Sequence, residues 1–406
     1  MTYTSKIDLS LVYGHEDKVA AALRTFSGGL MKTSDGPDGE LLPLNCENGS
    51  TLVNMANSMF IPDTQLFAAG DERANENVML TVMQTLFLRE HNRLARSLPS
   101  DWSDEMIYQT ARKWNIAQFQ SIVYNQYLPT VMGEPFPKYT GYNPNLNPQT
   151  DLHHSTAFFR YGHDQIPTIL YRVDEEGRIL DIGNVLLRDS FFDPTLVTEV
   201  GIGPYLRGAS SDIQMLMDAM VVDDVRDLLF DQDPFVSTDL VARNIQRGRE
   251  FGLGSYNDAR EAFGLSRCSN FSCITQDPVA LASLIEAYGN EGVDQVDVFV
   301  GALIETKYKN SAFLGELLFT GFVDQFSRFR DGDRFWYQNE GMFTQDELKQ
   351  IESVTIGDII NRNVLSKKRN PAPFPSNAFM NDRKTAVEIF SSVAASAAST
   401  VINFFI

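Results

Sequence analysis

The sequence contains few cysteines and few histidines, and this scarcity excludes several classes of protein. Among its 406 residues are three cysteines and five histidines. Three cysteines cannot build a disulfide-dense scaffold, although Cys268 and Cys273 could close a short loop in an oxidising compartment and leave Cys46 unpaired. Any metal site or acid–base site must draw on a short set of histidines: His15, His91, His153, His154 and His163.

Several common catalytic and binding motifs are also missing. The chain has no His-Glu-x-x-His motif and no pair of cysteines at zinc-ligand spacing, which excludes the common zinc sites. It has neither a nucleophile elbow nor a glycine-rich phosphate-binding loop. Internal repeats and low-complexity linkers are absent as well.

Basic residues are outnumbered, with 34 Lys and Arg against 53 Asp and Glu, for a formal charge of −19. A surface of this charge repels phosphate backbones and anionic lipids at long range. We therefore expect no nucleic-acid partner.

The chain lacks a long apolar run where a signal peptide would stand, because residues 1–8 contain none. This predicts either an intracellular protein or a chain whose start is missing.

Residues 389–406 carry no charge but are rich in Ala and Ser, which favours a packed terminal helix, with the beginning of a membrane anchor as the alternative. Two Asn-x-Ser tripeptides, at Asn48 and Asn270, would fit glycosylation in a secretory route.

The residues that are present favour a mainly α-helical protein. Hydrophobic residues make up 43% of the chain and aromatic residues 11%, enough to bury a substantial core. We predict one domain over residues 1–365 and a C-terminal extension over residues 366–406. Helical spacing of apolar residues, with capping and stop signals, predicts these helices: residues 71–98, 104–128, 211–231, 278–288, 313–329 and 345–351.

Evidence for strands is thin. Residues 168–173 and 178–182 flank a Glu-Glu-Gly turn and predict a minor β-hairpin. Residues 34–42 and 135–150 are polar and rich in Pro and Gly, which predicts surface excursions inside the domain.

His163 follows an apolar and aromatic run, residues 157–162, that contains the single guanidinium of Arg160. Composition alone favours a histidine that is hydrogen-bonded in the core over a metal ligand. Residues elsewhere in the chain change that balance.

Several separated blocks resemble, in the same order, those of the animal haem peroxidase family, which includes myeloperoxidase, lactoperoxidase, peroxinectins and dual-oxidase ectodomains. Each block alone is a modest signal, but their shared order from residue 4 to about residue 364 argues against coincidence. The resemblance implies an animal haem-peroxidase-like fold. The blocks are Ile7-Asp8-Leu9-Ser10-Leu11-Val12-Tyr13-Gly14, Ala69-Gly70-Asp71-Glu72-Arg73-Ala74-Asn75-Glu76, Thr85-Leu86-Phe87-Leu88-Arg89-Glu90-His91-Asn92-Arg93, Phe159-Arg160-Tyr161-Gly162-His163, Asn244-Ile245-Gln246-Arg247 and residues 314–343.

The resemblance implies that His163 is the axial ligand of a haem iron through one ring nitrogen. Asn244 would accept a hydrogen bond from the other ring nitrogen, and a neutral amide makes the imidazole less electron-donating than a carboxylate would. Arg160 and Arg247 would pair with haem propionates. Ion pairs without haem are the alternative for both arginines.

Arg73 matches the family's catalytic arginine, which would stabilise the negative charge that develops as the peroxide O–O bond breaks. Glu76 lies three residues later, on the same helical face, and matches a glutamate that forms an ester with a haem methyl group. Two departures refine the expected activity. Asn77 stands where myeloperoxidase has a haem-bonded methionine, so chloride oxidation is not implied. Arg160 replaces the radical-forming tyrosine of haem dioxygenases, which favours a peroxidase.

The start of the chain matches the family's calcium loop. Thr4, Asp8, Ser10 and a backbone carbonyl near Lys6 would form a partial Ca²⁺ site, weak because Ca²⁺ usually takes six to eight oxygen ligands. In the family, the preceding segment supplies the distal histidine, a second ester-forming aspartate and another calcium ligand. None of the histidines of this chain matches that segment. Because general acid–base catalysis contributes about 10²–10⁴-fold, Arg73 alone would activate peroxide slowly.

The resemblance implies a haem-dependent peroxidase that reduces H₂O₂ and oxidises small phenolic or halide-like donors, as an N-terminally incomplete chain. Its expected cofactors are haem b, with an ester link through Glu76 as an option, and Ca²⁺. Its expected location is extracellular or in the secretory pathway. The alternatives are a degenerate peroxidase-fold protein that binds haem or a partner with little catalysis, a fragment of a dual-oxidase-like membrane protein, and a helical scaffold without haem.

Overall fold

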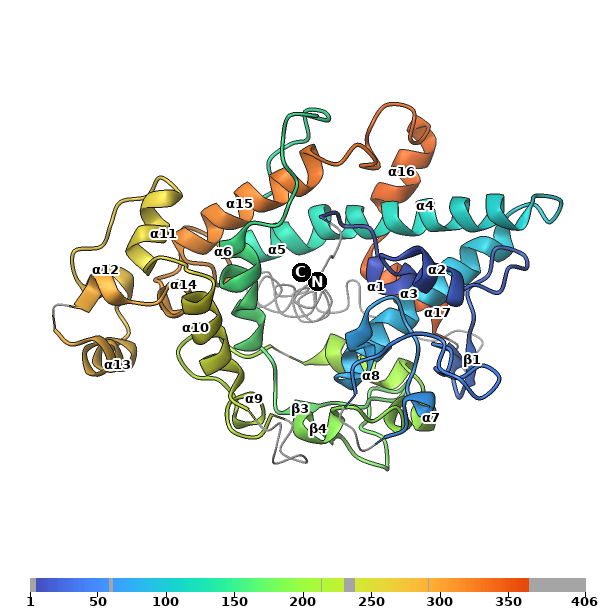
Figure 1. Ribbon diagram of the computed structural model, residues 1–406, viewed down its shortest axis with the longest axis horizontal. Coiled ribbons are helices and arrows are strands. Elements are labelled where there is room, and N and C mark those ends of the chain that lie inside the picture. Colours follow the sequence, from blue (N-terminus) through green and yellow to red (C-terminus); the bar gives the residue numbers. More distant parts are fainter. Residues whose placement is uncertain (1–4, 58–60, 213, 230–237, 291, 365–406) are drawn as a thin grey trace. The chain divides into compact units, whose positions relative to one another are not determined.

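The computed structural model describes five stretches of the chain: residues 5–57, 61–212, 214–229, 238–290 and 292–364. They form two compact units. Of the described residues, the first unit contains 5–126, 169–212 and 336–364, and the second contains the remainder between 127 and 335. Within the described part the fold is mainly α, as predicted, with two small two-stranded sheets (Figure 1). The predicted C-terminal extension, residues 366–406, lies outside the described residues, and the single-domain boundary at 365 stays a prediction.

Two long helices form the centre of the first unit (Figure 1). α3 (Val78–Ser97) and α4 (Asp104–Ile122) pack against each other. Asn77 and Ser103 start them, because each side chain accepts hydrogen bonds from backbone N–H groups of the first turn. Every residue of α3 from Val78 to Asn92 is buried, as in a core helix rather than a surface helix.

Two later helices of this unit begin with capping boxes. α16 (Gln345–Ser353) starts at Thr344, as predicted, and packs on α4. α17 (Ile356–Asn363) starts at Thr355 and packs on α3.

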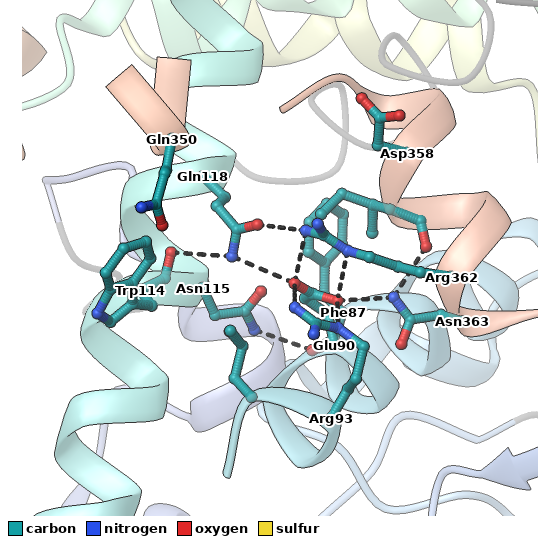
Figure 2. A network of polar contacts seen from close by, with 12 residues as sticks. Phe87, Glu90, Arg93, Trp114, Asn115, Gln118, Gln350, Asp358, Arg362 and Asn363 are labelled. Carbon is teal, nitrogen blue, oxygen red and sulfur yellow. Dashed lines mark hydrogen bonds and ion pairs between the residues drawn. The ribbon is translucent and has the colours of Figure 1, made fainter. Parts of the chain in front are cut away.

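A buried carboxylate holds α17 to α3 and α4. Glu90 of α3 is fully buried and accepts hydrogen bonds from Arg93, Arg362, Gln118 and Asn363 at 2.7–3.2 Å (Figure 2). Burial alone would raise the pKa of Glu90, but the hydrogen bond from Arg93 and the charges of both arginines outweigh it and lower the pKa. Glu90 is therefore an anion with its hydrogen-bonding capacity filled.

The other elements of the first unit are short. They are α1 (Ser10–Tyr13), α2 (Asp17–Ala22), η1 (Asp63–Gln65), η2 (Glu72–Asn75), η5 (Leu187–Ser190), α7 (Thr195–Val200) and α8 (Gly203–Ser211). Because η2 is a separate 3₁₀ turn, the helix predicted from residue 71 begins seven residues later, at Val78.

The predicted hairpin is confirmed at its turn and in part of its first strand, and its second strand is wrong. Val173 and Ile179 form an antiparallel bridge around that turn, but the regular strands are β3 (Ile169–Leu170) and β4 (Val185–Leu186). The ladder is interrupted because the backbone N–H of Arg172 donates to the side chain of Asn184 at 3.1 Å.

Residues 34–42, predicted as a surface excursion, contain a second antiparallel pair, β1 (Ser34–Gly36) with β2 (Gly39–Leu41). Residues 135–150 have no regular secondary structure, as predicted.

The second unit is built around the aromatic face of α15 (Glu316–Asp331). The rings of Phe322 and Phe326 of this helix contact the ring of Phe159, and Phe322 also contacts Tyr161. The helix begins three residues after the predicted position. The remaining elements are α5 (Leu128–Met132), α6 (Leu152–Thr156), η4 (Phe158–His163), α9 (Asp223–Arg226), α10 (Leu240–Glu250), α11 (Tyr256–Ala262), α12 (Phe271–Ile274), α13 (Pro278–Tyr288), η6 (Gly292–Gln295) and α14 (Val298–Ile304).

One helix prediction next to this unit is wrong at its end, and another is wrong in most of its length. The helix predicted over 104–128 is present, but it does not stop at Pro129. It passes through a π-helical turn, η3 (Val123–Tyr127), into α5, where Pro129 stands in the first turn and costs no hydrogen bond of α5. The helix predicted over 211–231 is interrupted, because the backbone N–H groups of Met215 and Asp218 donate to Gln165 and Asp164.

The predicted α13 and the predicted disulfide are confirmed. α13 begins behind its Asp277 cap, as predicted. Cys268 and Cys273 form a disulfide, and Cys46 is a free, exposed cysteine. Over the residues that the structure describes, no helix is long and apolar enough to cross a membrane.

Candidate functional site

His163 ends the 3₁₀ helix η4 in the second unit. Asp151 caps the preceding α6, and η4 follows directly. Phe159 and Tyr161 anchor η4 on α15, with ring centroids 5.7 and 5.6 Å from that of Phe322. This packing fixes the position of His163, which is 6% exposed.

Asn244 holds the ring of His163. It lies on α10, which Asp239 caps, and it is fully buried. Its Nδ2 is 2.8 Å from Nδ1 of His163, and its Oδ1 is buried with no hydrogen-bond partner among the described residues. If the amide turns over, Oδ1 accepts the Nδ1–H proton, and Nε2 is left with a free lone pair. This is the tautomer that a metal ligand requires.

The imidazole of His163 is neutral at physiological pH. Burial lowers its pKa to about 3, with smaller contributions from the charges of Arg160 and Arg247. Among the described residues, no group forms a hydrogen bond with Nε2. A neutral imidazole with one nitrogen oriented and the other available is the donor that haem iron takes.

Two arginines bring positive charge close to His163. The Nε group of Arg160 donates to the carbonyl of Ser155 at 2.9 Å, which orients the guanidinium. Arg247 lies on α10 beyond Asn244 and, within the described part of the chain, forms no ion pair. Burial and the charge of Arg243 lower the pKa of Arg247. The surroundings of His163 therefore suit an anionic group such as a carboxylate.

Arg73 and Glu76 lie in the first unit. Arg73 is in η2, where Asp71 both caps the turn and binds the guanidinium, with Oδ2 2.6 Å from Nη2. Glu76 follows at the end of the same turn, and its backbone N–H donates to the carbonyl of Arg73. The two predicted residues are therefore adjacent, while His163, Asn244, Arg160 and Arg247 gather in the second unit.

The predicted calcium loop is described in part. Asp8 Oδ1 accepts a hydrogen bond from the backbone N–H of Ser10 at 3.0 Å, and Lys6 is partly buried. Thr4 lies outside the described residues. In the part that the structure describes, no group of three or more His, Cys, Asp or Glu side chains could hold a metal ion. The partial Ca²⁺ site, which joins the single carboxylate of Asp8 to hydroxyl and carbonyl oxygens, stays a prediction.

Sequence reasoning missed His154. In the described part of the chain, neither of its buried ring nitrogens has a hydrogen-bond partner, and its ring stacks on Phe159 with centroids 4.8 Å apart. Burial lowers its pKa to about 3. Nothing in the pair His153-His154 marks one ring as buried. Asp71, which stands inside the block that identified Arg73, was also not singled out.

A family model described as animal haem peroxidase matches residues 1–374. The chain belongs to the animal haem peroxidase family. Peroxinectin A of Dictyostelium discoideum is 36% identical over 361 residues, and the dual oxidase of Drosophila melanogaster is 36% identical over 380 residues. Each alignment covers 88% of this chain, which spans 66% of Peroxinectin A and 24% of the dual oxidase.

The animal haem peroxidase fold is confirmed by a solved structure. Peroxidase A from Dictyostelium discoideum superposes with a TM-score of 0.82 at 34% sequence identity, over 91% of this chain and 71% of that one. Membership of the animal haem peroxidase family accounts for the ordered blocks of the sequence. It also gives a reason for the isolated histidine–amide pair in a helical core.

Proposed function

We propose that this chain is the haem-binding catalytic core of a peroxidase, which reduces H₂O₂ and oxidises small phenolic or halide-like donors one electron at a time. The observation that carries the proposal is the pair formed by His163 and Asn244. A buried, neutral imidazole whose second nitrogen is held by an amide is suited to ligate iron.

The residues around this pair fit a haem. Nε2 of His163 would bind the iron, and Arg160 and Arg247 would bind the propionates. From the family resemblance alone, Glu76 of the first unit would form an ester with a haem methyl group, as an additional covalent link. When bound, the haem would supply a redox-active iron for peroxide reduction.

The chain's own residues would orient the groups and stabilise charge. Asn244 would accept the Nδ1–H proton and fix the ring plane of His163. Arg73 would stabilise the negative charge that appears on the departing peroxide oxygen. The partial Ca²⁺ site formed by Thr4, Lys6, Asp8 and Ser10 would stiffen the start of the chain.

We also propose an extracellular or secretory location for the protein. The Cys268–Cys273 disulfide supports this location, because disulfides persist in oxidising compartments. The Asn-x-Ser tripeptides at Asn48 and Asn270 are compatible with glycosylation there.

The test is the absorbance spectrum of the full chain after haem is supplied. Wild type should show the Soret band of a histidine-ligated haem, and His163→Ala should lose it. His153→Ala is the matched control, because His153 is another histidine in the same region, bonded to Asp151 rather than to Asn244. An unchanged spectrum in His163→Ala would refute the assignment of His163 as the haem ligand. Haem binding without peroxide turnover would instead indicate a binding protein.

A further inference from the structure

Asp71 and Arg73 form a two-point ion pair in η2. Oδ1 of Asp71 is 3.0 Å from Nε of Arg73, and Oδ2 is 2.6 Å from Nη2. The same Oδ1 also accepts the backbone N–H of Arg73 at 2.9 Å. One carboxylate therefore holds both the backbone and the plane of the guanidinium.

The backbone that carries this carboxylate is held against α1. The backbone N–H of Asp71 donates to the carbonyl of Leu11 at 3.1 Å. A Cβ atom at Gly70 would be 2.3 Å from the carbonyl oxygen of Ser10 and 2.3 Å from the backbone nitrogen of Gly14. Because such distances are sterically forbidden, only glycine allows the backbone to approach α1 so closely. Asp71, the next residue, is 7% exposed.

Capping alone does not require this arrangement. A cap needs one acceptor oxygen, and Asn, Asp and Ser serve about equally well. Within the part of the chain that the structure describes, the second oxygen of Asp71 binds the side chain of Arg73 and takes no part in the cap. A bidentate contact restricts the orientation of a long side chain, because both carboxylate oxygens must face the planar guanidinium.

We propose that Asp71 is a positioning residue for Arg73, which it holds in one orientation, on a support provided by α1 through Gly70 and Leu11. The inference rests on the proposed function, in which Arg73 stabilises charge on the departing peroxide oxygen. Asp71 itself transfers no proton and contacts no substrate. Its contribution is an arginine that is already ordered before peroxide arrives.

Asp71→Asn separates positioning from capping. The amide keeps one acceptor oxygen for the backbone of Arg73, but it replaces Oδ2 by a donor that cannot bind Nη2. Asp71→Ser is the second variant, because it caps without reaching the guanidinium. Ser103→Asn exchanges one good cap for another at the start of α4 and is the matched control.

The first measurement needs no haem. Phenylglyoxal modifies arginine side chains, and peptide mass spectrometry of the full chain gives the rate at Arg73. Arg73 should react slowly in wild type and in Ser103→Asn, and about tenfold faster in Asp71→Asn, as expected for the loss of one charge-assisted hydrogen bond. The exposed Arg334 is the internal reference, and its rate should not change. Equal rates at Arg73 in wild type and Asp71→Asn would overturn the proposal.

The second measurement uses the haem-loaded chain. Asp71→Asn should lower the rate constant for H₂O₂ by about 10- to 100-fold, because a displaced charge stabilises the reaction less, and leave the rate of donor oxidation unchanged. Fluoride affinity of the ferric protein, read by absorbance, should fall in parallel. Equal losses in both rates would indicate a merely structural role and refute the positioning role.

The two proposals fail in distinguishable ways. If wild type binds no haem, the proposed function fails, while the phenylglyoxal rates still show whether Asp71 holds Arg73. If Asp71→Asn does not fold, the same test applies to Asp71→Ser. Rapid modification of Arg73 relative to Arg334 in the folded wild-type chain would refute the inference without any variant.

Discussion

Replacing His154 by leucine should make the protein more resistant to acid. His154 is 1% exposed, and neither ring nitrogen has a hydrogen-bond partner in the segments that the structure describes. Its pKa is about 3 in the folded protein, against 6.5 for an unperturbed histidine. The folded state therefore keeps the ring neutral, while the unfolded chain takes up a proton as the pH falls below about 6.5.

The sign and size of the effect follow from this difference. The pKa of His154 is lower in the folded protein than in the unfolded chain. Its titration therefore costs no stability above the unfolded pKa, and the free energy of unfolding falls as the pH drops from that value toward 3. Each pH unit in that window is worth about 1.4 kcal/mol, so lowering the pH from 7 to 5 should cost wild type about 2 kcal/mol through His154. Leucine has a similar volume and does not titrate.

At pH 7 the free energy of unfolding of His154→Leu should therefore exceed that of wild type by about 1 kcal/mol, because two unpaired polar atoms are removed. The advantage should grow by about 2 kcal/mol at pH 5. Urea unfolding of the haem-free chain at both pH values measures the difference. His153→Leu, in the same helix, is the control for loss of a half-buried histidine bonded to Asp151. An advantage of His154→Leu that stays constant between pH 7 and pH 5 would refute the reasoning.

Two further predictions concern Asn244 and Glu90. Asn244→Ala should weaken haem binding about 10- to 100-fold, as expected when the group that orients a metal-binding histidine is lost. Asn244→Asp should restore haem binding and should lower the reduction potential of the iron below that of wild type. Titration followed by the Soret band measures haem binding, and spectroelectrochemistry measures the reduction potential. Equal potentials in Asn244→Asp and wild type would contradict the predicted decrease. Glu90→Ala should destabilise the first unit by about 3–5 kcal/mol, because Arg93 and Arg362 lose a buried partner. Thermal melting with the exposed control Glu340→Ala tests this, and equal midpoints would show that the network adds nothing.

Local signals in the sequence were sufficient for several helices. The Asp277 cap and the Thr344 capping box mark the starts of α13 and α16 because a cap acts within a few residues of itself. The signal was insufficient over residues 211–231. There the backbone of Met215 bonds to Gln165, fifty residues earlier, and no local pattern contains that contact.

The candidate site divides in the same way. The ordered blocks identified His163, Asn244, Arg73 and Glu76 as residue types in a family pattern. Sequence could not show that His163 is neutral, because its pKa depends on burial by residues from several helices. It also could not show that Asp71 uses both carboxylate oxygens on Arg73.

The sequence by itself determined the family and the mainly α fold class and predicted the site residues, because these depend on composition, helical spacing and the order of short motifs. Only the tertiary structure decided which polar groups have partners. The buried amide of Asn244 on His163, the carboxylate of Glu90 among its four donors and the unpaired ring of His154 all depend on distant segments. The physical reason is that hydrogen bonding and desolvation are set by neighbours in space, and these are fixed only when the helices pack.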